Sequence, residues 1–193
     1  MRGLGVFLVA ATAVGCGYND IPIAEEQAKA ALAEVENQYQ RRADLVPNLV
    51  ATVKGFAEQE EQVLTAVTEA RAKASSVSID ASTITDPAAF QAFEASQSQL
   101  GGALGRLLVV SERYPDLRSS ENFLNLQSQL EGTENRIAIA RRDYNTAATQ
   151  VNTLRRTFPQ VIWASTVHSG EPFAYFSAKP GADEAPKVDF GGN

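Results

Sequence analysis

Apolar side chains recur at alternating steps of three and four residues along three long stretches, at approximately 23–77, 86–114 and 119–158. This spacing places them on one face of an α-helix, because a helix completes one turn about every 3.6 residues. The connectors, 78–85 and 115–118, are short, so neighbouring helices are expected to run antiparallel. The pattern predicts an all-α protein built as an elongated antiparallel helical bundle.

The first stretch contains a proline. Its expected inward positions are Leu32, Val35, Tyr39, Arg42, Val46, Leu49, Val53, Phe56, Glu60, Val63, Val67, Ala70 and Ala74. Pro47 lies inside this series, and proline usually kinks or ends a helix because it lacks an amide proton. The apolar repeat keeps its phase through Pro47, which favours one long helix kinked near that residue. The alternative is two helices, with Asp44 as the N-cap of the second.

The other two stretches have clear limits. Asp86 and Pro87 are typical of an N-cap followed by the first helical residue, and a serine at 119–120 is expected to cap the third stretch. The expected inward positions are Phe90, Phe93, Gln97, Leu100, Leu104, Leu107, Ser111 and Tyr114 in the second stretch, and Phe123, Leu126, Leu130, Thr133, Ile137, Ala140, Tyr144, Ala147, Val151, Leu154 and Phe158 in the third. The glycines at 101–102 and 105 either admit another helix or simply weaken this one, by about 1 kcal/mol each.

The apolar pattern fades after Pro159. Within the remaining chain, 161–164 is expected to form a short helical turn and 173–176 a strand-like or packed segment. Trp163 and the aromatic side chains of 173–176 are expected to pack against the bundle rather than contact a membrane. Residues 181–193, rich in glycine, proline and charge, are typical of a mobile tail.

The first residues resemble a secretory signal peptide. Arg2 precedes the apolar run GLGVFLVAATAVG, which is too short for a span of roughly 20 residues, and Cys16 follows it. The residues at 13–16, Ala-Val-Gly-Cys, resemble a bacterial lipobox, so Cys16 is expected to carry lipid after cleavage. An uncleaved N-terminal helix is the alternative. The expected organisation is a signal peptide at 1–15, a tether at 16–22, the helical bundle at 23–158, and an irregular segment with a mobile tail at 159–193.

Composition narrows the classes of function. The net charge of −6 argues against nucleic acid as a partner and against broad electrostatic adhesion to anionic lipid. Cys16 is the only cysteine and His168 the only histidine, which excludes an intramolecular disulfide and a zinc site built on cysteines. The sequence contains no Asp-rich loop of the calcium-binding type. No metal, cofactor or catalytic residue is expected.

Several blocks of the sequence are similar to one known family. They are 38–50 (QYQRRADLVPNLV), 52–56, 112–117, 130–138, Arg141, Tyr144, Asn145 and 186–190. These blocks resemble the LemA family over roughly residues 18–190. The resemblance implies a four-helix fold that is membrane-tethered or outside the cytoplasm, with no established enzymatic activity. Family members often carry His-Glu where this chain has Gln59 and Glu60, so no role of that histidine is carried over.

Charged residues at inward positions are the candidate functional residues. Arg42 and Glu60 lie there, and a buried charge is costly unless it is paired. One interpretation is a structural pair or register device, with Asp44, Arg106, Glu131, Glu134 or Arg136 as candidate partners. The other is a polar layer at which a peptide or ligand docks. The polar residues of this candidate interaction or structural layer are Arg42, Glu60, Glu131, Glu134, Asn135 and Arg136.

These observations predict a non-enzymatic protein, anchored in the cell envelope by its N-terminus, whose domain lies on the periplasmic side. It is expected to act as a scaffold or interaction module for other envelope proteins, and homo-oligomerisation is left open. The alternative is a ligand-binding or enzymatic bundle that uses a buried polar layer around Arg42 and Glu60.

We predict that Cys16→Ser abolishes globomycin-sensitive processing and releases or mislocalises the protein, because the acyl chains on Cys16 would supply its attachment. Membrane fractionation and the intact mass of the mature protein measure both effects. An unchanged mass and unchanged fractionation would contradict lipidation.

We also predict that Arg42→Met leaves the fold intact or stabilises it, because an apolar side chain then replaces a buried charge. Thermal unfolding followed by circular dichroism measures this. A folded variant that has lost its function would favour the docking interpretation over the structural one.

Overall fold

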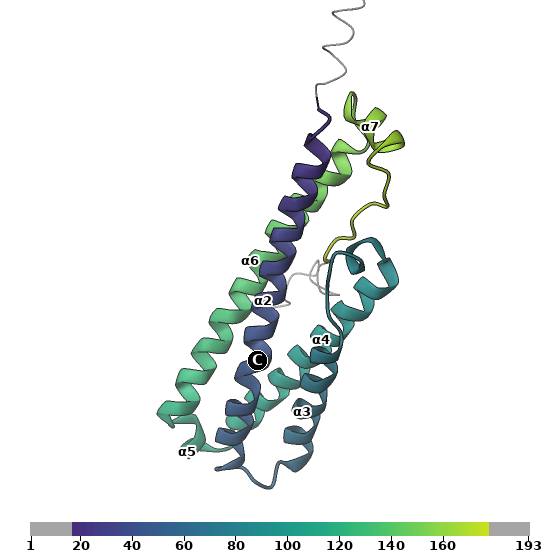
Figure 1. The fold of residues 1–193 in the computed structure, drawn as a ribbon. Helices are drawn as coiled ribbons and strands as arrows, with labels where there is room; N and C mark the ends of the chain where they lie inside the picture. Colours follow the sequence, from purple (N-terminus) through teal and green to yellow (C-terminus); the bar gives the residue numbers. More distant parts are fainter. Residues whose placement is uncertain (1–16, 178–193) are drawn as a thin grey trace, which may run out of the picture.

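The computed structural model describes residues 17–177 (Figure 1). The elements in chain order are α2 (Asp20–Lys54), α3 (Glu61–Ser76), the short 3-10 helix η1 (Thr83–Thr85), α4 (Pro87–Ser111), α5 (Pro115–Arg118), α6 (Glu121–Leu154) and α7 (Gln160–Thr166). No strand occurs in this part of the chain, so the predicted all-α class is confirmed. The expected leader, Cys16 and the tail at 181–193 lie outside the described residues.

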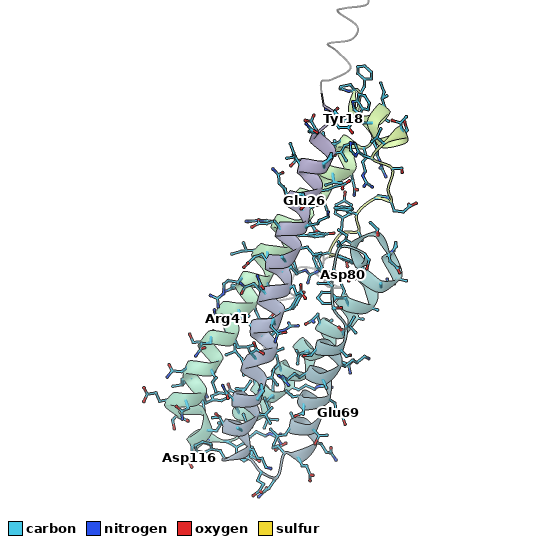
Figure 2. All side chains as sticks on the ribbon, in the orientation of Figure 1. Tyr18, Glu26, Arg41, Glu69, Asp80 and Asp116 are labelled. Atoms are coloured by element: carbon cyan, nitrogen blue, oxygen red, sulfur yellow. The ribbon has the colours of Figure 1, made fainter. Side chains whose placement is uncertain are left out.

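Two long antiparallel helices, α2 and α6, lie side by side along the length of the molecule (Figure 1). The shorter helices α3 and α4 form a second antiparallel pair, in which α3 also packs against α2. The 35 residues of α2 make a helix about 50 Å long. Tyr18 lies at one end of this rod and Asp116 at the other (Figure 2). The predicted elongated four-helix bundle is confirmed.

The first predicted helix was too long. The chain leaves α2 after Lys54, turns through 55–60 and returns as α3. A repeat of apolar residues does not show a reversal of direction, and here it kept its phase through the turn. Pro47 lies inside the continuous α2, so a second helix capped by Asp44 is also wrong, whereas a kink at Pro47 stays a prediction. Phe56, expected inside, is exposed in the turn.

The remaining boundaries differ by a few residues. The carboxylate of Asp86 accepts hydrogen bonds from the amides of Ala88 and Ala89, which confirms this N-cap. The helices end earlier than predicted, α4 at Ser111 and α6 at Leu154, so Phe158 is exposed rather than inward. The first helix begins at Asp20 rather than at 23, and the helical turn expected at 161–164 is confirmed as the slightly longer α7. No helix of residues 17–177 is long and apolar enough to cross a membrane.

The core consists of two apolar clusters that follow one another along the rod. The aromatic cluster contains Ala24, Ala28, Leu32, Val35, Tyr39, Ile79, Ile84, Phe90, Phe93, Ile137, Ala140, Tyr144, Ala148, Val151, Phe173 and Phe176. The aliphatic cluster contains Val46, Leu49, Val53, Ala57, Leu64, Val67, Ala70, Ala74, Leu100, Ala103, Leu104, Leu107, Leu117, Phe123 and Leu130. All four long helices contribute, because each presents one apolar face to the others.

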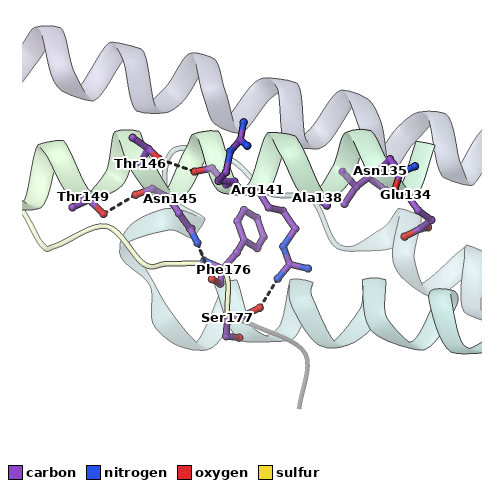
Figure 3. Close-up of a pocket in the computed structure, with 11 residues that line it drawn as sticks. Glu134, Asn135, Ala138, Arg141, Asn145, Thr146, Thr149, Phe176 and Ser177 are labelled. Atoms are coloured by element: carbon purple, nitrogen blue, oxygen red, sulfur yellow. Dashed lines mark hydrogen bonds between the residues drawn. The ribbon is translucent and has the colours of Figure 1, made fainter. Parts of the chain in front are cut away.

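The segment 171–177 is held to α6 by two asparagines. The side-chain amide of Asn152 donates to the carbonyl of Phe173 at 2.9 Å, and its oxygen accepts from the Phe173 amide at 2.8 Å. Asn145 makes the same pair of bonds to Phe176, both at 2.9 Å (Figure 3). Asn145 and Asn152 are seven residues apart, a rise of about 10.5 Å along α6. Phe173 and Phe176 are three residues apart, which is a similar distance of about 10 Å in extended chain. This match places both phenylalanine rings in the aromatic cluster, as predicted for 173–176.

We predict that Asn152→Ala lowers the free energy of unfolding by about 2 kcal/mol, because it removes two hydrogen bonds and leaves the buried backbone groups of Phe173 unpaired. Denaturant-induced unfolding measures the change. Asn125→Ala is the matched control, since Asn125 is exposed on the same helix and gains the same helix propensity. Equal effects of the two substitutions would contradict the structural role of Asn152.

Candidate functional site

Arg42 is the most deeply buried charged side chain of the bundle core, with 4% of its surface exposed. One terminal nitrogen, Nη1, donates to the Glu134 carboxylate at 3.0 Å. The other, Nη2, donates to the Gln97 backbone carbonyl at 2.9 Å and to the Gln97 side-chain oxygen at 2.7 Å. The guanidinium also lies 4.9 Å from the centre of the Tyr39 ring. A single side chain therefore joins α2, α4 and α6.

The polar contacts continue to the fourth long helix and separate the two core clusters. The Gln97 amide nitrogen donates to the carbonyl of Ala74 in α3 at 3.3 Å. Along α2, α4 and α6, this layer lies between a residue of the aromatic cluster and one of the aliphatic cluster, such as Tyr39 and Val46 on α2. Burying a guanidinium costs several kcal/mol, and its hydrogen bonds offset that cost. Glu134 keeps 41% of its side chain exposed, so solvent weakens the ion pair.

A groove with a volume of about 910 Å³ lies beside Arg42, between α4 and α6. These two helices pack mainly on α3 and α2 respectively, which leaves their facing sides apart. The groove is lined chiefly by Tyr39 and Arg42 of α2, by Gln97, Gly101, Gly102, Leu104, Gly105 and Leu108 of α4, and by Leu130, Glu131, Glu134, Asn135, Ile137 and Arg141 of α6. Burial raises the pKa of the Tyr39 phenol above its ordinary value, so its hydroxyl stays neutral at physiological pH.

The glycines of α4 expose backbone to this groove. An added Cβ at Gly101 would meet only Nη1 of Arg42, at 3.7 Å, and a Cβ at Gly102 or Gly105 would meet nothing within 4 Å. No helix of residues 17–177 therefore packs closely on this face. The sequence left two explanations for these glycines, namely that they admit another helix or that they weaken α4. No helix of the described chain packs closely against them.

Glu60 does not join the layer of Arg42. Its carboxylate lies in the turn between α2 and α3, where it accepts a hydrogen bond from the Tyr114 hydroxyl and pairs with Arg113, both at 3.1 Å. The predicted joint layer of Arg42 and Glu60 is wrong, because the reversal at 55–60 carries Glu60 to the end of the rod. Among the candidate partners, Glu134 is the residue that Arg42 contacts.

The other predicted residues divide between two faces of α6. Glu131, Glu134 and Asn135 line the groove. Arg136 instead donates to the side chains of Gln38 at 3.2 Å and Thr133 at 3.3 Å, on the side of α6 that faces α2. Three of the four polar residues predicted on this helix therefore lie together.

Sequence reasoning missed the pair that closes one end of the groove. Arg141 and Glu94 form an ion pair at 3.0 Å. Arg141 also donates to the Ser177 carbonyl at 2.7 Å (Figure 3), and Glu94 accepts from the Ser177 amide at 3.2 Å. Arg141 follows Glu134 by seven residues and so shares its face, a signal that was available in the sequence. Nothing in the sequence indicated that Ser177 would join them.

The site offers hydrogen bonding, charge and apolar contact. Within 17–177, no group of three or more His, Cys, Asp or Glu side chains is arranged to hold a metal ion. The mixed lining, with apolar walls and a few fixed polar groups, is suited to binding.

Comparison with known proteins shows to which family this chain is similar. The family model described as "LemA family" matches residues 31–190. The chain is 25% identical to the magnetosome protein MamQ of Magnetospirillum gryphiswaldense and to MamQ 2 of Paramagnetospirillum magneticum; both alignments cover 86% of this chain and 66% of the relative. It is also 25% identical to protein LemA of Metamycoplasma hominis, over 72% of this chain and 60% of that protein.

The chain thus spans just under two thirds of the length of the magnetosome relatives. The family match includes the polar layer, the groove and the segment 171–177. It confirms the resemblance that the sequence blocks suggested. The chain belongs to the LemA family.

Proposed function

We propose that this chain is a non-enzymatic interaction module, anchored to a membrane of the cell envelope through lipid on Cys16 and facing the periplasm. Its groove between α4 and α6 receives an amphipathic helical segment of another envelope protein. The observation that carries the proposal is the groove itself, which the described residues 17–177 leave unfilled and whose lining includes the buried cation of Arg42.

The lining of the groove suits a helix. Leu104, Leu108, Leu130 and Ile137 supply apolar surface. The bare backbone at Gly102 and Gly105 permits the close approach that small residues allow between helices. Amphipathic helices commonly bind other proteins by laying their apolar face into such grooves.

Arg42 provides a polar anchor for the incoming segment. Its Nε atom is buried and has no hydrogen-bond partner among the described residues. An acceptor that the partner brings to Gly101 would lie near Nη1 of Arg42, because an added Cβ at Gly101 would be 3.7 Å from that atom. Glu134, being partly exposed, can turn towards solvent when the partner arrives.

The family description and the names of the relatives do not identify a partner. Two of these relatives are named as magnetosome proteins, and this description applies to the relatives alone. For this chain, the identity of the partner is left to experiment.

A second candidate function is the binding of a small molecule in the same groove. Its volume of about 910 Å³ falls within the usual range of roughly 300–1,000 Å³ for ligand pockets, and its lining offers both guanidinium and carboxylate groups. Native mass spectrometry of the protein purified from cells tests this candidate. A bound small molecule that is lost in Arg42→Met would support it over a protein partner.

We predict that a photo-crosslinking residue at Ser98, which lines the groove, captures a distinct protein in native membranes, and that Gly102→Leu abolishes the product. The leucine would project into the groove, where nothing within 4 Å opposes its Cβ. Immunoblotting and mass spectrometry of the crosslinked product measure the effect.

Two controls accompany this experiment. Gly132→Leu makes the same change on α6, at a residue that does not line the groove, and is expected to retain the product. A crosslinker at the exposed Ile139 reports on contacts elsewhere. Identical products at Ser98 and Ile139, or none at Ser98, would contradict docking in the groove, and a product of two copies of this chain would show homo-oligomerisation instead.

A further inference from the structure

The end of the rod that carries α7 exposes a concentration of apolar side chains. Of the eleven large apolar side chains that are exposed among residues 17–177, five belong to this apolar end, namely Tyr18, Phe158, Val161, Ile162 and Val167. Phe158 is 80% exposed and Ile162 is 49% exposed. The other six are distributed among several elements and are Ile23, Phe56, Val109, Leu124, Ile139 and Tyr175.

The stretch of chain that supplies most of the apolar end contains no charged residue, although Asp20 and Arg156 lie at its border. Residues 157–170 contain no Asp, Glu, Lys or Arg, although such residues make up 21% of the chain. About three would be expected in a stretch of that length with average composition. A cluster of exposed apolar side chains with few charged neighbours marks a site of contact with another apolar surface.

The apolar end lies where the described part of the chain begins, with α7 labelled in Figure 1 and Tyr18 in Figure 2. The Tyr18 ring lies 5.2 Å from the Trp163 ring and 5.1 Å from the His168 ring. The Gln160 amide donates to the Asp20 carboxylate at 2.7 Å, which fixes α7 to the start of α2. Cys16 is two residues from Tyr18, a reach of about 7 Å at most. A lipid on Cys16 would therefore hold the apolar end at the bilayer surface.

We propose that the apolar end inserts into the interfacial region of the lipid bilayer and points the rod away from the membrane. This proposal rests on the anchoring through Cys16 that is part of the proposed function. Lipid is the occupant that fits, because Tyr18 and Trp163 are of the residue types enriched at membrane interfaces and the side chains beside them are apolar. The net charge of −6 disfavours electrostatic adhesion, so the contact is apolar.

Trp163 makes the proposal testable because it is the only tryptophan of the chain. The full chain, purified from membranes, is reconstituted into vesicles of phosphatidylethanolamine and phosphatidylglycerol with and without brominated acyl chains. We expect the brominated lipid to quench Trp163 emission, and that emission to lie at shorter wavelength than in detergent-free buffer. The double variant Phe158→Ser, Ile162→Ser should lose most of the quenching while still floating with the vesicles.

The matched control is Val109→Ser, Ile139→Ser, which removes two exposed apolar side chains of α4 and α6 and should leave quenching unchanged. Flotation without quenching, or equal quenching in both double variants, overturns the inference while leaving the anchor intact. Failure to float overturns the anchor and the inference together. A photo-crosslinker at Ile162 that labels a protein rather than lipid in native membranes also overturns it, since the apolar end would then be a protein interface.

Discussion

The structure depends on the hydrogen bonds that the buried Arg42 guanidinium makes halfway along the bundle. Arg42 can keep its charge in the core only if several acceptors meet it, and they come from Gln97 on α4 and Glu134 on α6. Apolar contacts allow one helix to slide along another. The hydrogen bonds of Arg42, in contrast, would break if one of the three helices shifted by a single turn. The layer therefore fixes the register of α2, α4 and α6, and it divides the core into an aromatic and an aliphatic half.

The same layer lies at the floor of an incomplete interface. In a closed four-helix bundle each helix packs on two neighbours, but here α4 packs mainly on α3 and α6 on α2. The gap between α4 and α6 is filled at one end by the segment 171–177, which the two asparagines of α6 hold in place. Beyond Ser177 the described residues leave the gap open as the groove, so this part of the bundle is where we propose that a partner binds.

The proposed functions follow from the difference between the end of the rod that carries α7 and the groove on its side. The end at which the described chain begins exposes five large apolar side chains, and the groove lies farther along the side. A protein held in this way would present the groove at a distance from the bilayer. The long α2 and α6 supply that distance, because each is about 50 Å long and packing against the other stabilises it.

The sequence alone determined the class of fold, since the recurrence of apolar residues along α2, α4 and α6 reflects local helical geometry that any bundle must obey. It also identified Arg42 as a buried charge and Glu134 as one of its candidate partners. Only the tertiary structure decided that the chain reverses at 55–60, which separated Glu60 from Arg42, because a heptad repeat has the same phase in a continuous and in a folded-back helix. Only the tertiary structure showed the groove and the packing of residues 171–177 against α6. Both depend on contacts between residues far apart in the chain, and such contacts produce no periodic pattern in the sequence.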